Sequence, residues 1–278
     1  MNPPTLASRY RTAFVTGAST GLGRAFAEML LQEGVAVWGT ARDARRLPVG
    51  AGFRPVTLEL GDGAAAERIF LEADRAAGGF DLVINNAGFG AFGAFAQTDF
   101  SVWEEQLRVM LVNTARLSHV ALRGLLARRR GALVNISSIA GEFGMPYQAA
   151  YNTAKAGLSA LNESLMVETA GSGVIIIDFR PGDFRTDFEG SVRRPAAVGP
   201  VDAGTTARLA RAWAAFAGMM QSGPAPAQAA GALRRALLRG CSGTVRTGRF
   251  FQAVLGPFLA RFGSLALRRK VQAKYFGL

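Results

Sequence analysis

The first 180 residues alternate short apolar segments with stretches of helix length, and this alternation restricts the fold more than any other feature. The short segments are rich in Val, Ile and Leu and apolar on both faces, which is typical of strands buried between two helical layers. We predict strands at 12–16, 35–40, 53–58, 81–85, 131–137 and 173–179, and helices at 21–33, 64–77, 100–127 and 152–169. The pattern predicts an α/β protein with a three-layer, Rossmann-type, doubly wound parallel sheet.

The pattern changes after residue 187. The segment 189–206 is polar and contains Gly and Pro, so we predict a flexible loop there. Helices at 204–220 and 225–239 and a last strand at 243–248 follow, and the final segment has a helical apolar face interrupted near Gly256-Pro257. We expect one domain at 1–249, with a substrate loop at about 187–225, and an amphipathic helical tail at 250–278.

Composition narrows the class of protein. A single cysteine, Cys241, excludes an internal disulfide and a zinc cluster, and we expect no metal site. The sequence has neither a signal-peptide-like N-terminus nor eighteen consecutive apolar residues, so we expect a cytoplasmic protein without a transmembrane helix. The net charge of +12 would suit a nucleic acid, but the arginines are scattered and no nucleic-acid motif accompanies them. We therefore expect no nucleic-acid partner.

A glycine-rich loop, "VTGASTGLGRAF", follows the first strand and opens a helix. Glycines permit a tight turn and let a pyrophosphate approach, while the helix N-terminus offers N–H groups to that anion. The spacing G-x-x-x-G-x-G differs from the general dinucleotide fingerprint, and a simple tight turn is the alternative. The predicted cofactor contacts in this loop are Gly17, Ser19, Thr20, Gly21, Leu22 and Gly23.

The end of the second strand, "GTARDARR", indicates which dinucleotide binds. Ala41 stands where an NAD site usually has an acidic residue, and Arg42 follows it. A guanidinium suits a 2′-phosphate, so the sequence favours NADP over NAD. The alternative is that Arg42 is a solvated surface charge.

The segment "YNTAK" places Tyr151 and Lys155 four residues apart, on one face of a predicted helix. A free tyrosine has a pKa of about 10, and an adjacent ammonium stabilises the phenolate. We therefore predict that Lys155 lowers the pKa of Tyr151 for proton transfer to and from a carbonyl oxygen. The alternative is an ordinary pair on a helix surface.

Six segments, in order and spanning about residues 10–190, resemble motifs of the short-chain dehydrogenase/reductase family, in its short single-domain, NADP-preferring branch. They are "TGASTGLG" (16–23), "NNAG" (85–88), Asn113 in "LVNTA", "NISS" (135–138), "YNTAK" (151–155) and "RPGDFRT" (180–186). The resemblance implies an oxidoreductase in which Tyr151 is the general acid or base and Ser138 holds the carbonyl oxygen. It also implies that Lys155 binds the nicotinamide ribose and that Asn113 holds a water linking Lys155 to solvent.

The same resemblance implies further cofactor contacts. Thr186 would bind the nicotinamide carboxamide, in a turn shaped by its neighbours. Glu59 stands where the family usually has Asp near the adenine, so that contact is less well defined. The implied contacts beyond the glycine loop are Glu59, Leu60, Asn85, Ala87, Gly88, Tyr151, Lys155, Pro181, Gly182, Phe184 and Thr186.

Aromatic residues suggest a lipophilic substrate, although they could equally be core residues. They lie in the loop 88–97 and at Phe143, Tyr147 and Phe188, together with Met145. Asp183 is an unusual acid beside the expected site; it could accept bonds from Arg180 or Arg185 and, if it faced the substrate, would disfavour anions.

The tail, 250–278, resembles the family branch of lipophilic-alcohol dehydrogenases and lacks the ending typical of acyl-carrier-protein reductases. We interpret it, in order of preference, as a helix that caps the core, as a wall of the substrate site, or as an interfacial helix at a membrane surface.

The sequence thus predicts an NADP(H)-dependent oxidoreductase that interconverts a ketone or aldehyde and an alcohol. A non-catalytic NADP(H)-binding sensor or scaffold is the alternative. We expect a homodimer formed through the helices at 100–127 and 152–169.

Overall fold

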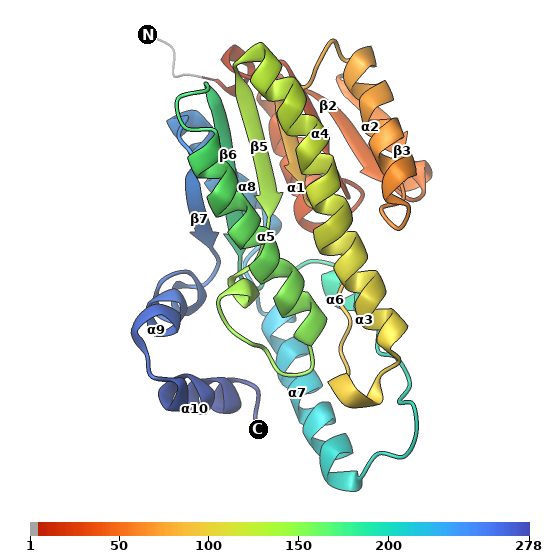
Figure 1. Cartoon of the computed structure of the whole chain (residues 1–278), viewed down its shortest axis with the longest axis vertical. Helices are drawn as coiled ribbons and strands as arrows, with labels where there is room; N and C mark the ends of the chain where they lie inside the picture. The colour runs from red at the N-terminus through yellow and green to blue at the C-terminus, as the bar shows by residue number, and fades with distance from the viewer. Residues whose placement is uncertain (1–4) are drawn as a thin grey trace.

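The computed structural model describes residues 5–278, which build a parallel sheet of seven strands in the order β3-β2-β1-β4-β5-β6-β7 (Figure 1). This arrangement confirms the predicted doubly wound α/β fold. Every neighbouring pair runs parallel, and both faces of the central strands are buried. The strands are β1 (Thr12–Val15), β2 (Ala36–Ala41), β3 (Phe53–Thr57), β4 (Leu82–Asn85), β5 (Gly131–Ile136), β6 (Val174–Pro181) and β7 (Gly243–Thr247).

Helices cover both faces of the sheet and make the outer two of three layers. One apolar core lies between the sheet and α1 and α8; a second lies between the sheet and α2, α4 and α5. Figure 1 shows the second group in front of the sheet and the first behind it. The helices are α1 (Gly21–Gln32), α2 (Gly63–Ala76), α3 (Phe100–Leu107), α4 (Asn113–Arg128), α5 (Ala149–Glu168), α6 (Phe188–Ser191), α7 (Ala203–Gln221), α8 (Pro226–Arg239), α9 (Gly256–Phe262) and α10 (Leu265–Tyr275).

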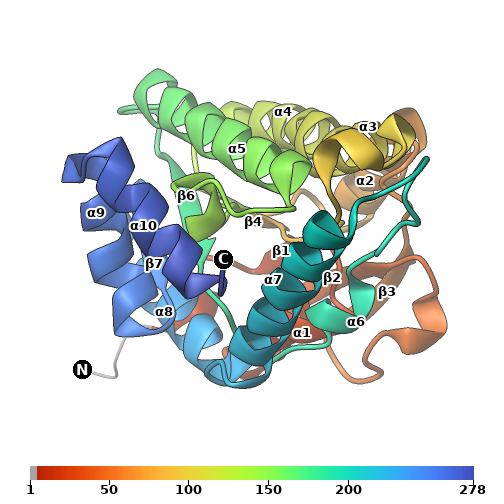
Figure 2. The ribbon, with the colours of Figure 1, turned by 90° about the horizontal axis from the view of Figure 1, so that it is seen from below.

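The carboxyl ends of all seven strands meet at one edge, because the strands are parallel. The strand order reverses between β1 and β4, and in open α/β sheets such a reversal opens a crevice at this edge. Helices α6 and α7 and the tail helices gather there (Figures 1 and 2). The segment predicted as a loop at 189–206 differs in part, because α6 includes its first residues and α7 begins at Ala203, capped by Asp202.

The predicted helix at 100–127 is interrupted. A π-helical turn, Arg108–Val112, separates α3 from α4. Such a turn adds a residue to the helical repeat and changes the direction in which the following side chains point.

The tail is helical, but its interruption lies elsewhere than predicted. A π-helical turn, Phe251–Leu255, continues into α9, with Pro257 in the first turn of that helix. The chain instead breaks at Gly263, which is extended, and Ser264 caps α10 by accepting a bond from the Leu267 N–H at 3.3 Å. None of the helices within residues 5–278 combines the length and the apolar character needed to cross a membrane.

Candidate active site

A cavity of about 1290 Å³ opens at the carboxyl edge of the sheet. It collects most of the residues that the sequence predicted for a site. They are Gly17, Ser19, Thr20, Gly21, Leu22, Arg42, Glu59, Leu60, Ala87, Gly88, Ser138, Tyr151, Lys155, Pro181, Gly182, Phe184 and Thr186. Three predicted residues, Gly23, Asn85 and Asn113, do not line it.

The glycine loop connects β1 to α1 and forms one side of the cavity. Gly17 and Gly21 have φ values of 68° and 57°, a conformation that favours glycine. Thr20 precedes α1 without capping it through its side chain, so the N–H groups of the first turn remain available to an anion. Gly23 has a packing role instead, because a Cβ there would lie 2.1 Å from the Gly17 carbonyl oxygen. These features fit a dinucleotide pyrophosphate.

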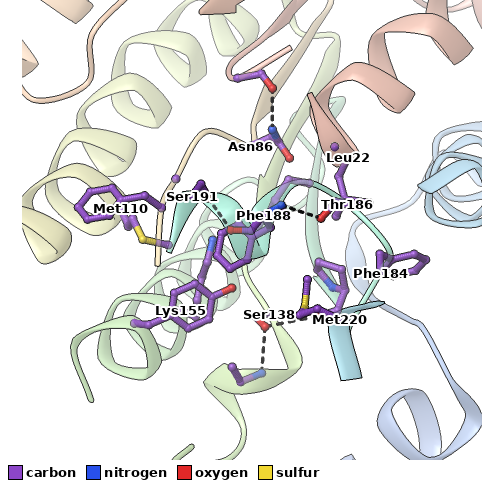
Figure 3. Close-up of a pocket in the computed structure, with 18 of the residues that line it drawn as sticks. Leu22, Asn86, Met110, Ser138, Lys155, Phe184, Thr186, Phe188, Ser191 and Met220 are labelled. Carbon is purple, nitrogen blue, oxygen red and sulfur yellow. Dashed lines mark hydrogen bonds between the residues drawn. The ribbon is translucent and has the colours of Figure 1, made fainter. Parts of the chain in front are cut away.

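Asn85 belongs to a buried polar network and not to the cavity wall. It is the last residue of β4, and its Nδ2 donates to Asn135 Oδ1 at 2.9 Å and to Ser118 Oγ at 3.0 Å. Asn86 lines the cavity in its place, held by bonds from its Nδ2 to the carbonyl oxygens of Thr16 and Gly17 (Figure 3). The sequence offers a signal for this exchange, because successive residues leaving a strand point to opposite sides.

Asn113 likewise lies outside the cavity. It is buried at the start of α4, and its Nδ2 donates to the Leu60 carbonyl oxygen at 2.5 Å. This bond ties α4 to the loop after β3, and within residues 5–278 no hydrogen bond joins Asn113 to Lys155. Met110, within the π-helical turn, faces the cavity instead and packs against Gly88 (Figure 3).

Arginine side chains lie at the end of β2. Arg42 is exposed, lines the cavity and makes no hydrogen bond or ion pair with another residue of the described range. Asp43 accepts bonds from the Arg45 backbone and guanidinium, at 2.9–3.2 Å, which fixes its carboxylate on that neighbour. Arg46 also lines the cavity and was not predicted. Arg42 and Arg46 therefore border the cavity beside the Asp43 carboxylate, which is already paired with Arg45.

Ser138, two residues after the end of β5, comes together with Tyr151 on α5. The Ser138 Oγ accepts a bond from the Ala140 N–H at 3.0 Å and lies 3.4 Å from the Pro181 carbonyl oxygen. Burial raises the pKa of the Tyr151 phenol to about 12; a hydrogen bond with Ser138 lowers it, and the charge of Asp183 raises it. The neighbouring Ser137 is engaged elsewhere, since its hydroxyl donates to Asp178.

The effect predicted for Lys155 on the pKa of Tyr151 is not seen. The ammonium Nζ donates to the Ile136 carbonyl oxygen at 2.7 Å and lies 5.7 Å from the centre of the Tyr151 ring. Burial lowers the pKa of Lys155 to about 8, and Asp178 raises it. The pKa of Tyr151 is raised and not lowered, because desolvation of the phenol outweighs the other influences.

Gln148 is a further cavity residue that the sequence analysis missed. It lies one turn before Tyr151 and is only 1% exposed. Neither its Oε1 nor its Nε2 has a hydrogen-bond partner among the described residues. Buried amides normally have partners, so this amide is available to a bound ligand. The signal in the sequence was its spacing of three residues from Tyr151.

Asp183 connects the cavity to the tail. Its carboxylate accepts a bond from Gln252 Nε2, and Tyr275 Oη lies 3.4 Å away. Arg180 and Arg185 were the partners predicted from the sequence, but Arg180 instead pairs with Asp178 and Glu142. Burial raises the pKa of Asp183, and the bonds from Gln252 and Tyr275 lower it.

The remaining lining is largely apolar. Phe143, Met145 and Phe188 line the cavity, and the Phe188 ring centre lies 6.1 Å from that of Tyr151. Tyr147 does not line it and packs on Phe92. Side chains of α7 and of the tail complete the wall, namely Phe216, Met219, Met220, Phe251, Val271, Tyr275 and Phe276.

Known proteins resemble this chain in sequence and in fold. The family described as short chain dehydrogenase matches residues 11–197. A "3-oxoacyl-[acyl-carrier-protein] reductase FabG" from Vibrio cholerae is 31% identical over 202 residues, which are 70% of this chain and 83% of that protein. A short chain dehydrogenase/reductase from Burkholderia phymatum, solved with NAD, has a TM-score of 0.79 at 22% identity and 95% coverage of both chains. One from Burkholderia cenocepacia, solved with NADP, has a TM-score of 0.71 at 22% identity, covering 98% of this chain and 99% of its own.

Proposed function

The chain belongs to the short-chain dehydrogenase family, and on that premise we propose that it is an NADP(H)-dependent oxidoreductase interconverting a lipophilic ketone or aldehyde and the corresponding alcohol. The observation that carries the proposal is the convergence of Ser138, Tyr151 and Lys155 on the cavity that also contains the glycine loop. The bound nicotinamide would supply or accept the hydride.

Tyr151 is the proton donor in reduction. Burial raises the pKa of its phenol to about 12, so the hydroxyl is protonated at neutral pH, which is the state a general acid requires. Ser138 orients the same carbonyl oxygen by a hydrogen bond. In the oxidative direction the phenolate accepts the proton from the alcohol.

Lys155 holds the cofactor ribose. Its Nζ is anchored on the Ile136 carbonyl oxygen, which leaves two further N–H groups for ribose hydroxyls. With a pKa of about 8, most of this lysine is charged at neutral pH. The first turn of α1 binds the pyrophosphate, and Arg42 and Arg46 bind the 2′-phosphate.

The apolar lining supports a lipophilic substrate. Phe188, Phe216 and Met219 come from α6 and α7 and face the cavity. Among the described residues that line the cavity, Gln148 is the one whose buried side-chain polar atoms have no hydrogen-bond partner. We infer that Gln148 bonds a polar group of the substrate.

The exposed apolar side chains Val112, Leu126 and Val167 on the π-helical turn, α4 and α5 support a homodimer through these helices.

The proposal is tested by NADPH absorbance with a panel of ketones and aldehydes of increasing apolar size, assayed in parallel with NADH. We expect turnover with NADPH and a kcat/KM that rises with apolar size, because each buried methylene adds about 0.8 kcal/mol of binding. Tight NADPH binding without turnover of any panel member would favour a sensor or scaffold.

Replacing Arg42 with alanine is expected to lower the kcat/KM for NADPH by about 10- to 100-fold, because one charge-assisted bond contributes about 1.5–3 kcal/mol. The value for NADH should change less than about threefold. Arg68→Ala is the matched control, since Arg68 is exposed on α2 and does not line the cavity. An equal loss with both cofactors would show that Arg42 does not read the 2′-phosphate.

A further inference from the structure

We propose that the tail docks the protein onto a membrane surface that carries anionic lipids, with the mouth of the cavity beside that surface. The first observation concerns exposed apolar side chains on the tail. Phe250, Phe258, Phe262 and Leu265 are 61–71% exposed, and Val254, Leu255 and Leu267 are 47–49% exposed. Phe258 and Phe262 form an exposed aromatic pair on α9, with ring centres 5.0 Å apart. We call these seven residues the apolar face of the tail.

This apolar face is inconsistent with the preferred interpretation from the sequence, a helix capping the core. The buried residues of the tail are Gln252, Gly256, Pro257 and Phe276, and all of them except Pro257 line the cavity. The tail is anchored by Gln252 on Asp183 and by Gln272, whose Nε2 donates to the Gly144 carbonyl oxygen at 3.1 Å. Phe250, Phe258 and Phe262 take no part in these anchors, so their exposure has no explanation within the described chain.

The distribution of charge along the chain indicates what kind of surface the apolar face of the tail contacts. Residues 1–202 contain twenty cationic and twenty acidic side chains, whereas residues 203–278 contain twelve cationic side chains and no acidic one. The whole net charge of +12 therefore lies in the last segment of the chain. Around the apolar face, Arg261, Arg269, Lys270 and Lys274 are exposed and form no ion pair with another described residue.

Cations beside exposed phenylalanines match an anionic lipid surface, which offers negative headgroups above an apolar interior. A second copy of this chain fits less well, because pairing two such faces would bring like charges together. A nucleic acid would use the cations but would leave most of the aliphatic residues of this face without a partner.

The position of the tail gives this docking a role, which rests on the proposed function. The two tail helices lie outside the helical layers, beside α7 at the carboxyl edge of the sheet (Figures 1 and 2). The same tail that carries the apolar face also lines the cavity, through Phe251, Val271, Tyr275 and Phe276. A lipophilic substrate could therefore pass from the lipid to the cavity without crossing bulk water.

The docking is tested by co-sedimentation of the full chain with vesicles. We expect binding to an equal mixture of phosphatidylglycerol and phosphatidylcholine, little binding to phosphatidylcholine alone, and weakening by salt. The double variant Phe258→Ser/Phe262→Ser should lower the partition coefficient at least about tenfold, given roughly 1.5–3 kcal/mol for each buried phenylalanine. Arg261→Gln/Lys270→Gln/Lys274→Gln should lower it on the anionic vesicles only.

Phe100→Ser is the matched control, because Phe100 is 65% exposed on α3 and lies outside both the tail and the cavity lining. The proposal is overturned if this control loses as much binding as the tail variant, or if no vesicle binds the protein. It is also overturned if Phe258→Ser/Phe262→Ser only dissociates a dimer, or if duplex DNA binds and vesicles do not.

Assays of ketone turnover distinguish the membrane-docking proposal from the proposed oxidoreductase function. The double tail variant should retain the wild-type rate on a water-soluble ketone and lose rate on a ketone carried in vesicles. Equal rates on both substrates would remove the delivery role, while the oxidoreductase assignment would stand. No turnover by the wild type with either ketone would contradict the proposed function and leave vesicle binding as a separate result.

Discussion

Replacing Tyr151 with phenylalanine is expected to lower kcat at least a hundredfold, because positioned proton transfer typically contributes about 10²–10⁴-fold. The ring of Tyr151 packs among residues of the second core, and phenylalanine preserves that packing. Only the hydroxyl is removed, so the affinity for NADPH, measured by fluorescence titration, should change little. Turnover near the wild-type rate with a substrate of the panel would show that another group donates the proton.

Tyr10→Phe is the control for the loss of a phenol. Tyr10 is buried outside the cavity lining, where its Oη lies 3.4 Å from the Leu237 carbonyl oxygen, and the variant should keep full activity.

The pH dependence of the oxidation rate gives a second test of the role of Tyr151. Because burial raises the pKa of Tyr151 to about 12, the phenolate fraction grows with pH throughout the neutral range. The oxidation rate of the wild type should therefore rise with pH, and Tyr151→Phe should lose that dependence.

Features set by neighbouring residues could be predicted from the sequence. Buried strands are apolar on both faces, so their number and order along the chain follow from the pattern of hydrophobic residues. The glycine loop and the pair of Tyr151 and Lys155 each lie within a single turn or element, where spacing determines which side chains share a face. Ser137 and Ser138 both line the cavity, but the Ser137 hydroxyl donates to Asp178, and the choice of Ser138 stays a prediction.

Features set by long-range packing could not be predicted. Asn113 follows a π-helical turn, and its side chain bonds the Leu60 carbonyl oxygen, which lies 53 residues before it in the chain. Asp183 bonds Gln252 and Tyr275, which follow it by 69 and 92 residues. The raised pKa of Tyr151 comes from desolvation, which depends on everything packed around the phenol. Spacing alone contains none of this information.

A buried polar network behind the site is the second place where a single substitution should have a large effect. Asp178 on β6 is fully buried and accepts bonds from the Ser137 hydroxyl, from Asn162 Nδ2 at 3.1 Å and from Arg180 Nε at 2.7 Å. Arg180 is itself mostly buried and also pairs with Glu142 at 2.7 Å. Three donors thus converge on one carboxylate, two of them neutral and one charged.

Asp178→Ala is expected to lower the free energy of unfolding by about 3 kcal/mol, at the lower end of the roughly 3–5 kcal/mol that follows loss of one partner of a buried ion pair. The loss is large because Ser137 and Asn162 lose their acceptor while remaining buried. It stays at the lower end because Arg180 keeps its bond to Glu142. Urea unfolding followed by circular dichroism measures the change.

Asp99→Ala is the matched control for removing a carboxylate from an exposed position. Asp99 caps α3 by accepting a bond from the Ser101 N–H at 2.9 Å, and loss of such a cap costs about 1 kcal/mol. Because Asp178 also raises the pKa of Lys155, any Asp178→Ala protein that folds should hold a less charged lysine and bind NADPH more weakly at neutral pH. Equal stability of Asp178→Ala and Asp99→Ala would show that the network around Asp178 contributes no more to folding than a surface helix cap. Weaker NADPH binding by Asp178→Ala would then reflect only the lower charge of Lys155.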